Sequence, residues 1–497
     1  MRSVSTLLYG IHLLLLGLLC LSALSRVLML WPARLRRAGG EPPAPLAGDD
    51  VPEVLVQLPL YNEPLVAERL LRSCAHLDWP RHRLVLQVLD DSTDATAGIV
   101  DAVSSELRSN GVRIDVVRRR TREGFKAGAL AAGLRHSEAS LIAIFDADFI
   151  PPRDFLRRMV PSLDDPEAGL VQARWAHLNA DRNLLTAAQA ALLDGHFQVE
   201  QRARFHRGHF FNFNGTAGLW RRQAIEDAGG WQADTLTEDL DLSYRAQLAG
   251  WRFVYRDDVA VPAELPTTLD AFRTQQRRWA KGGLETLRKL ARPILRSRYS
   301  LRLKLAALAH LSANANYILL AGVAITLPLL AFIRPDRAFP VVHGGMLLVG
   351  LGGAALFTLL CQRTVPWRQR LLRTPLALLL DVGIAHQKAA AAIEALRGRR
   401  TPFVRTPKSG DVGTPAVSTR ESTTAEDVGR APGFHAEPLW ALWSTMGAAA
   451  ALSSPDLIHG AFLLAFALAQ ATVGLTARRH RLEVADTAVR SPVAAGA

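Results

Sequence analysis

The sequence predicts an α/β protein with a doubly wound, mostly parallel sheet, joined to an α-helical transmembrane region. Three observations support this fold class. Short apolar runs alternate with helical patterns between residues 50 and 265. Long apolar runs lie on both sides of this stretch. Polar and acidic clusters follow the expected strands, where such sheets bind their ligands.

Four apolar runs are expected to be strands of this sheet. They lie at residues 53–60, 83–89, 112–117 and 141–145, and a helical pattern follows each of them. Strands that alternate with helices form largely parallel sheets covered on both faces. No glycine-rich dinucleotide motif or Walker A loop follows any of these runs, so dinucleotide oxidoreductases and P-loop proteins lose their main support.

Apolar segments near both ends of the chain predict a membrane protein. Spans are expected at Leu7–Leu30, Leu311–Ile333, Val341–Cys361, Leu439–Leu452 and Leu457–Thr476. The first run is too long for a signal-peptide core and precedes the basic stretch WPARLRR, which places its C-terminal side in the cytoplasm. We therefore expect a multi-pass protein of the cell membrane with a cytoplasmic soluble domain.

The chain divides into seven expected parts. These are an N-terminal transmembrane helix at 1–31, a cytoplasmic domain at 50–265, an amphipathic interfacial helix at 266–300, two transmembrane helices at 311–361, a cytoplasmic interfacial helix and flexible loop at 362–436, two more transmembrane helices at 437–476, and a cytoplasmic tail at 477–497. Residues 375–393 carry Asp381, His386 and Lys388, which favours an interfacial helix there over a sixth span. The polar stretch 409–433 is expected to be disordered.

The net charge of +13 does not point to nucleic acid, because the arginines cluster beside apolar runs, where they set membrane topology and contact anionic lipid. The three cysteines, Cys20, Cys74 and Cys361, are scattered, so neither a disulfide framework nor a thiolate metal site is supported.

Acidic residues follow three of the expected strands. Asp146 and Asp148 form an Asp-x-Asp pair, and hard oxygen ligands at this spacing suit a Mg²⁺ or Mn²⁺ ion that bridges them to a diphosphate. A solvated turn would explain the pair taken alone. Its position after a buried strand, in register with Glu63, Asp90 and Asp91, favours the metal site, although the last two also suit helix capping.

Glu238 and Asp239 begin a helical pattern. Acids in the first turn of a helix are favoured by its dipole whatever the function. The functional interpretation is that one of them, and we choose Asp239, is the general base that removes a proton from an acceptor hydroxyl.

Gln275, Arg278 and Trp279 fall at i, i+3 and i+4 and share one helical face. A basic amphipathic helix on the membrane, with the tryptophan as its anchor, explains this pattern. A sugar-binding face explains it equally well, because an indole ring stacks on a sugar while arginine and glutamine bond to hydroxyls or phosphate.

Taken together, YNE, DDSTD, KAGAL, DAD, FNGTAG, TED and QQRRW stand in an order and spacing that resembles the family 2 glycosyltransferases of the cellulose synthase type. The resemblance covers about residues 50 to 290, and residues 251–282 are especially similar to the mannan and glucomannan synthases. It implies a GT-A-type fold and an inverting hexosyltransferase, dependent on Mg²⁺ or Mn²⁺, that moves a sugar from UDP-glucose or GDP-mannose to a growing β-glycan. The alternative is a glycolipid synthase that adds one sugar to diacylglycerol or a polyprenyl phosphate.

The same resemblance implies roles for individual residues. Glu63, Asp90 and Asp91 are expected at the nucleotide, Lys126 near the phosphates, Asp146 and Asp148 beside the metal diphosphate, Asp239 as the base with Glu238 next to it, and Phe213, Asn214, Gly215, Thr216, Gln275, Arg278 and Trp279 at the acceptor. The stretch 402–408 is similar to a gating-loop motif, Phe-x-Val-Thr-x-Lys, at Phe403, Thr406 and Lys408, but carries Arg405 in place of the valine.

A transporter or scaffold that had lost catalysis is expected to lack one of these carboxylates. None is missing, and the expected spans carry few polar residues, chiefly Asn314, Asn316 and Gln470. The implied partners are a nucleotide-sugar donor, a glycan or lipid acceptor and membrane lipid, and no nucleic acid.

Overall fold

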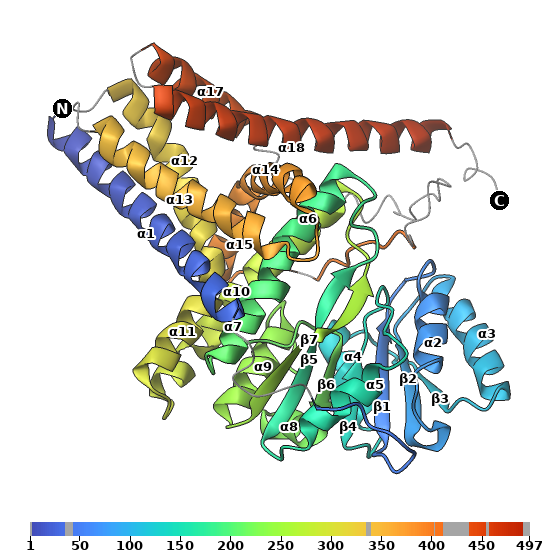
Figure 1. Cartoon of the computed structure of the whole chain (residues 1–497). Helices are drawn as coiled ribbons and strands as arrows, with labels where there is room; N and C mark the ends of the chain where they lie inside the picture. The colour runs from blue at the N-terminus through green and yellow to red at the C-terminus, as the bar shows by residue number, and fades with distance from the viewer. Residues whose placement is uncertain are drawn as a thin grey trace.

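The computed structural model describes residues 2–34, 43–333, 339–401, 403–410, 437–453 and 457–490. A sheet with its covering helices forms one region, and long helices from the two ends of the chain pack together beside it (Figure 1). The polar stretch for which disorder was expected lies outside the described residues, apart from residues 409 and 410.

The sheet has seven strands. They are β1 Val54–Leu60, β2 Leu84–Asp90, β3 Ile114–Val117, β4 Leu141–Ile144, β5 Ala168–His177, β6 Gly218–Arg221 and β7 Arg252–Ala263. Their order across the sheet is β3-β2-β1-β4-β6-β5-β7. Only β6 runs antiparallel to its neighbours, β4 and β5, and the other pairs are parallel. The predicted fold class, a doubly wound and mostly parallel sheet, is confirmed.

Helices cover both faces of the sheet. They are α2 Ala67–Ala75, α3 Thr96–Ser109, α4 Phe125–Leu134, α5 Phe155–Met159, α6 Leu184–Asp194, α7 Gln201–His206, α8 Arg222–Asp227 and α9 Glu238–Leu248, with short 3₁₀ turns at Arg81–Arg83 and Val160–Leu163 and a π-helix at Gly195–Glu200. Alternate residues of β1 face opposite sides, so Val54 and Val56 pack with α2, α3 and α5, whereas Leu55 packs with α4, α8 and α9. Burial on both faces explains why this strand is a continuous apolar run.

A long helix, α10 Leu269–Arg296, leads from the sheet to the other helices. It is followed by α11 Leu301–Leu311, a 3₁₀ turn at Ala313–Ala315, α14 Trp367–Gly383 and α15 Ala385–Leu396 further along the chain. Ion pairs hold α10 in place, because Arg277 pairs with Glu394 of α15 at 2.8 Å and the buried Arg273 pairs with Glu437. The face of α10 that carries these arginines is therefore fixed to its neighbours.

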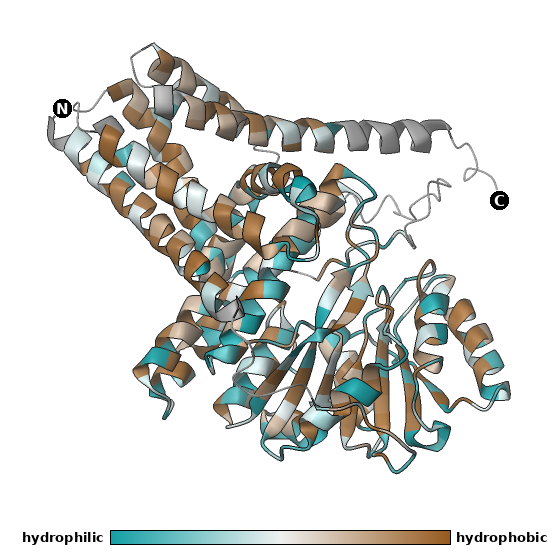
Figure 2. Cartoon of the chain, viewed as in Figure 1, coloured by the Kyte–Doolittle hydropathy of each residue, from teal (hydrophilic) through white to brown (hydrophobic). Residues whose placement is uncertain are grey.

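The remaining helices are α1 Arg2–Arg34, α12 Asn316–Ile333, α13 Phe339–Cys361, α17 Glu437–Leu452 and α18 Leu457–Arg490. Apolar residues predominate along α1, α12 and α13, which lie side by side (Figure 2). Four helical segments in the described chain are long and apolar enough to cross a membrane, and they lie in α1, in α12 with the 3₁₀ turn before it, in α13 and in α18. The protein is therefore a membrane protein by composition.

Two segments differ from the expected spans. Helix α17, where a fourth span was expected, has only 16 residues and is not among the four. Helices α14 and α15 pass the same test as a pair, bent by 47°, where an interfacial helix was expected. The number of passes and their orientation stay predictions.

Candidate active site

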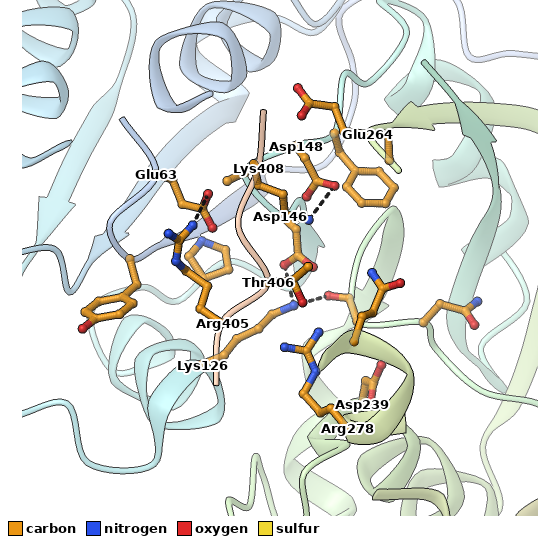
Figure 3. A pocket seen from close by; sticks show the side chains of 18 of the residues that line it. Glu63, Lys126, Asp146, Asp148, Asp239, Glu264, Arg278, Arg405, Thr406 and Lys408 are labelled. Carbon is orange, nitrogen blue, oxygen red and sulfur yellow. Dashed lines mark hydrogen bonds and ion pairs between the residues drawn. The ribbon is translucent and has the colours of Figure 1, made fainter. Parts of the chain in front are cut away.

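The carboxyl ends of β1, β2 and β4 open into one pocket. Glu63 follows β1, Asp91 follows β2, and Asp146 and Asp148 follow β4, and all four line the pocket. Because β1 lies between β2 and β4 in the sheet, the carboxylates succeed one another along its edge with Glu63 in the middle. Residues of α9 and α10 line the same pocket, and Figure 3 shows Asp239 and Arg278 beyond Lys126.

Lysines neutralise both carboxylates of the Asp-x-Asp pair. Lys126 Nζ lies 2.5 Å from Asp146 Oδ1, and Lys408 Nζ lies 2.8 Å from Asp148 Oδ2. The backbone N–H of Asp146 donates to Thr216 Oγ1 at 2.9 Å, which fixes the chain as it leaves β4. Burial raises the pKa of Asp148, and Lys408 opposes that shift. Each carboxylate therefore already has a cation beside it.

The pair fits a divalent ion that arrives with its ligand. Among the described residues, no group of three or more His, Cys, Asp or Glu side chains is placed to hold a metal ion. Mg²⁺ is usually bound by one or two carboxylates together with substrate phosphates and water. Asp146 and Asp148 supply such carboxylates, and a diphosphate would complete the coordination.

Lys126, Gly215 and Asp239 meet at the centre of the pocket. Lys126, in the first turn of α4, also donates to the Gly215 carbonyl at 2.8 Å. Gly215 has a φ of +81°, and a Cβ there would lie 3.1 Å from Asp239 Oδ2 and 3.4 Å from Lys126 Nζ. Only glycine fits this conformation without strain, so it allows the lysine and the aspartate to approach the same backbone.

Glu238 and Asp239 occupy the first turn of α9 and both line the pocket. Asp239 Oδ1 accepts a hydrogen bond from the backbone N–H of Leu240 at 2.8 Å. Burial and the neighbouring Glu238 raise the pKa of Asp239 to about 7, against the opposing charge of Lys126. A carboxylate with a pKa near neutrality can accept a proton at physiological pH and release it again.

The predicted face of α10 lies in the pocket. Gln275, Arg278 and Trp279 all line it. The Arg278 guanidinium lies 4.8 Å from the centre of the Phe403 ring, and Arg278 Nη1 is 3.4 Å from the Val404 carbonyl. The face is therefore turned toward the pocket, which favours the ligand-binding interpretation over a membrane anchor.

Residues 403–410 cross the pocket. Phe403 stacks on Phe125 with ring centres 5.5 Å apart, and the buried Thr406 lies beside Asp146 and Lys126 (Figure 3). Glu264, directly after β7, holds the end of this segment: its Oε2 accepts from the backbone N–H groups of Ser409 and Gly410, both at 3.1 Å. The motif residues at 403, 406 and 408 all line the pocket.

At the β1 and β2 end of the pocket, two arginines face two carboxylates. Arg119 donates to both oxygens of Asp91, at 3.0 and 2.5 Å. Arg405 Nη1 lies 2.9 Å from Glu63 Oε2, but without hydrogen-bond geometry, so this buried oxygen has no hydrogen-bond partner among the described residues. Burial raises the pKa of Glu63 to about 7 even though Arg405 and Lys408 oppose the shift.

Three expected site residues lie outside the pocket lining. Asp90 is buried at the end of β2, where it pairs with Arg118 at 2.8 Å. Phe213 packs against Trp220 in the core, and Thr216 is buried beneath Asp146. The first two side chains support the fold, and the third positions the strand end. Neither Asp90 nor Asp91 caps α3, because Asp94 accepts from its first N–H, that of Thr96.

Sequence reasoning missed several residues of the pocket. Glu264 and Trp175 line it, and Arg119 holds Asp91 beneath it. Glu264 follows β7 directly, as the other carboxylates of the pocket follow their strands. It was missed because β7 itself was not predicted. His196, in the π-helix, donates from Nε2 to Asn214 Oδ1 at 3.0 Å and lines an adjoining cavity. No pattern in the sequence marks it.

A second cavity, of about 310 Å³, adjoins the first. Its volume lies at the lower end of the ~300–1,000 Å³ typical of ligand sites. Asp239, Trp279, Asn214, Trp175 and Thr237 line both cavities. The lining of the second cavity also includes side chains from helices beyond the sheet: Arg26 of α1, Tyr317 of α12, Phe357 of α13, Asp381 of α14 and Lys388 of α15. The carboxylate of Asp239 thus stands where the two cavities meet.

Comparison with known proteins agrees with this geometry. Residues 52–282 match the family described as glycosyltransferase like family 2. The probable glucomannan 4-beta-mannosyltransferase 11 of Arabidopsis thaliana is 47% identical over 260 residues, which cover 51% of this chain and 58% of that protein. The glucomannan 4-beta-mannosyltransferase 1 of Oryza sativa subsp. japonica is 43% identical over 293 residues, 56% of each chain. The chain thus matches little more than half the length of these relatives.

A solved structure shares the fold. The mannosyltransferase PcManGT from Pyrobaculum calidifontis, in complex with GDP-Man and Mn²⁺, has a TM-score of 0.57 at 23% identity and covers 79% of this chain and all of that one. The pocket described above lies within the matched stretch apart from residues 403–408. Residues 52–282 are therefore similar to the family 2 glycosyltransferases, and within this range the chain is similar in sequence to the glucomannan 4-beta-mannosyltransferases.

Proposed function

We propose that the chain is a membrane-embedded, inverting hexosyltransferase that extends a β-glycan with a sugar from UDP-glucose or GDP-mannose. The position of Asp239 carries this proposal: it is a carboxylate with a pKa raised to about 7, at the junction of two cavities. A group at that junction reaches a donor sugar on one side and an acceptor hydroxyl on the other. The relatives named glucomannan 4-beta-mannosyltransferase support the same reaction.

The donor is proposed to lie along the edge of the sheet. Its diphosphate would be held at Asp146 and Asp148 with a divalent ion, with Lys126 beside it, since these groups combine two carboxylates for the ion with a lysine for the phosphates. The ion would offset the charge that develops on the departing nucleoside diphosphate. The Mn²⁺ bound with GDP-Man in PcManGT is consistent with a divalent ion, and the choice between Mg²⁺ and Mn²⁺ is open to experiment.

Residues 403–408 must adjust when the donor binds. Lys408 forms an ion pair with Asp148, and Arg405 forms one with Glu63. A metal ion held by Asp146 and Asp148 would replace the charge that Lys408 now supplies, and Lys408 would then be available to contact phosphate oxygens.

The transfer is a single displacement. An acceptor oxygen forms a bond to the anomeric carbon while the bond from that carbon to the phosphate oxygen breaks, and the nucleoside diphosphate leaves. Asp239 receives the hydroxyl proton. Attack from the face opposite the leaving group inverts the anomer. Trp279, which lines both cavities, is placed to stack on the terminal acceptor sugar while Gln275 and Arg278 bond to it or to the diphosphate.

The second cavity supports an acceptor that continues toward the membrane. Its aromatic and polar lining suits a glycan, and it extends to side chains of α1, α12, α13, α14 and α15. We propose that the growing chain occupies this cavity and that the sheet domain faces the cytoplasm, where nucleotide sugars are made available to it.

Product analysis tests the proposal. The full chain in lipid nanodiscs is supplied with UDP-glucose or GDP-mannose and with Mg²⁺ or Mn²⁺, beside an Asp239→Asn variant. A long β-linked polymer from one donor, absent with the variant, is the expected result. One sugar on extracted lipid would assign the chain to glycolipid synthesis. No transfer from either donor, with the fold intact, contradicts the proposed reaction.

A further inference from the structure

The arrangement of the pocket sets the direction in which a donor must lie. In the proposed function the diphosphate is at Asp146 and Asp148, and the transferred sugar is at Asp239. The nucleoside then has to extend the other way, toward the ends of β1 and β2. Glu63, Tyr61 and Arg122 line the pocket at that end.

One wall of this end can stack on any base. The Arg122 guanidinium lies over the Tyr61 ring, 3.2 Å from its centre, and both line the pocket. Stacking on a planar group does not distinguish one base from another, because every base has a π-face. Selection among bases must therefore come from hydrogen-bonding groups nearby.

Glu63 and Arg405 are the groups with capacity to spare. Both oxygens of Asp91 are taken by Arg119. Glu63 is only 8% exposed, and its Oε2 lies 2.9 Å from Arg405 Nη1 in an ion pair, which leaves the carboxylate with lone pairs for a ligand. Arg405 makes its one described polar contact through Nη1, so Nε and Nη2 remain to donate. A buried carboxylate beside an arginine with donors to spare suits a ligand that carries donors and acceptors on adjacent edges.

Guanine matches this pair and uracil does not. Guanine offers an N–H and an amino group to a carboxylate on one edge, and its O6 and N7 accept two hydrogen bonds from an arginine on the next. Uracil has one N–H between two carbonyls and no counterpart of N7, so it leaves part of the pair unsatisfied. Leaving a buried polar group unpaired is what makes such sites selective.

We propose that Arg405 and Glu63 form hydrogen bonds with the base of the donor and thereby select a guanine nucleotide over a uracil nucleotide. This inference rests on the proposed function, because it takes the pocket to be a nucleotide-sugar site. It assigns a role to the residue at which the segment departs from the gating-loop motif that it resembles, where arginine replaces valine.

Equilibrium binding of nucleoside diphosphates is the test. GDP, UDP and ADP are titrated into the full chain in nanodiscs with Mn²⁺. A well-formed bidentate contact discriminates by about 1–3 kcal/mol, or about 5- to 150-fold. We expect wild-type protein to bind GDP more tightly than UDP or ADP by a factor in this range, and Arg405→Val to lose most of that preference with its UDP affinity unchanged.

Three further variants sharpen the test. Arg405→Lys keeps the charge but lacks the planar fork, so it is expected to lose most of the preference as well. Glu63→Gln is expected to weaken GDP and spare UDP. Arg113→Val removes an exposed guanidinium that pairs with Glu53 and is expected to change neither affinity.

The outcomes separate the two proposals. A wild-type protein that binds neither GDP nor UDP with Mn²⁺ contradicts the proposed function. Equal affinity for GDP and UDP, or a preference for UDP, is compatible with the proposed transferase function but contradicts the proposed selection of guanine. A loss of GDP and UDP binding in equal measure in Arg405→Val also overturns it, because the arginine would then contact the ribose or phosphates that both ligands share.

Discussion

The pKa of Asp239 leads to a prediction about the pH dependence of transfer. Burial and the adjacent Glu238 raise this pKa to about 7, and a general base acts in its ionised form. Activity should therefore fall as the pH drops through about 7. For a single group with this pKa, the ionised fraction rises about tenfold between roughly pH 6 and pH 8. The value of kcat/KM is expected to rise by the same factor.

Replacing Glu238 tests the physical cause. Glu238→Gln removes the negative charge that opposes ionisation of Asp239, so the pKa of Asp239 falls and the acid limb of the profile moves to lower pH. A unit charge about 4 Å away is worth about 1 kcal/mol in water and about 4 kcal/mol at an effective dielectric constant of about 20, so for this buried carboxyl group we expect a shift of at least about 0.7 pH units. Activity at about pH 6 should consequently rise relative to activity at about pH 8.

The assay follows release of nucleoside diphosphate at subsaturating donor, from about pH 5.5 to pH 9, with the chain in nanodiscs. Asp239→Asn is the control, expected to lose about 10²- to 10⁴-fold at every pH. Superimposable profiles for wild type and Glu238→Gln would show that the neighbouring charge does not set the pKa. Loss of activity in Glu238→Gln, with activity kept in Asp239→Asn, would assign the base to Glu238.

Three other outcomes follow from the structure. Arg273→Met leaves the buried Glu437 carboxylate without its arginine, so thermal and denaturant unfolding in detergent should show about 3–5 kcal/mol lost, with partial recovery when Glu437→Met is added; an unchanged stability contradicts this. Gly215→Ala forces a Cβ to 3.1 Å from Asp239, so turnover should fall at least about tenfold in a folded protein, whereas Gly98→Ala, in open space, should be neutral. Chelation with EDTA should stop transfer and Mn²⁺ or Mg²⁺ restore it; transfer that persists in EDTA excludes a metal at the Asp-x-Asp pair.

The parts of the fold that are local in sequence could be predicted. The strands β1, β2 and β4 are apolar runs buried on both faces, and this composition is visible without any structure. The strands β5, β6 and β7 were not predicted. β6 has only four residues. The residues of β5 become half-buried toward its carboxyl end, where Trp175 lines the pocket. Neither strand therefore shows a simple apolar pattern.

The same division applies to the site. Carboxylates that directly follow strands were placed together in the expected pocket, because the topology of a parallel sheet determines where they go. The ion pairs of Arg405 with Glu63 and of Lys408 with Asp148 join residues hundreds of positions apart, and no periodicity indicates them. Helix α17 shows the limit for membrane segments, since its apolar run is clear but its 16 residues are short for a span.

The π-helix at Gly195–Glu200 has a consequence for how this architecture diversifies. A π turn holds one residue more than an α turn, and such turns are frequent at functional sites. His196, Phe197 and Glu200 line the second cavity from this turn, and Gly195 gives Phe357 room to approach. Removing a single residue here would restore α geometry and rotate the preceding residues by about 100° relative to those that follow. A change of one residue in length, with no substitution, would thus exchange the side chains that this segment presents to the second cavity.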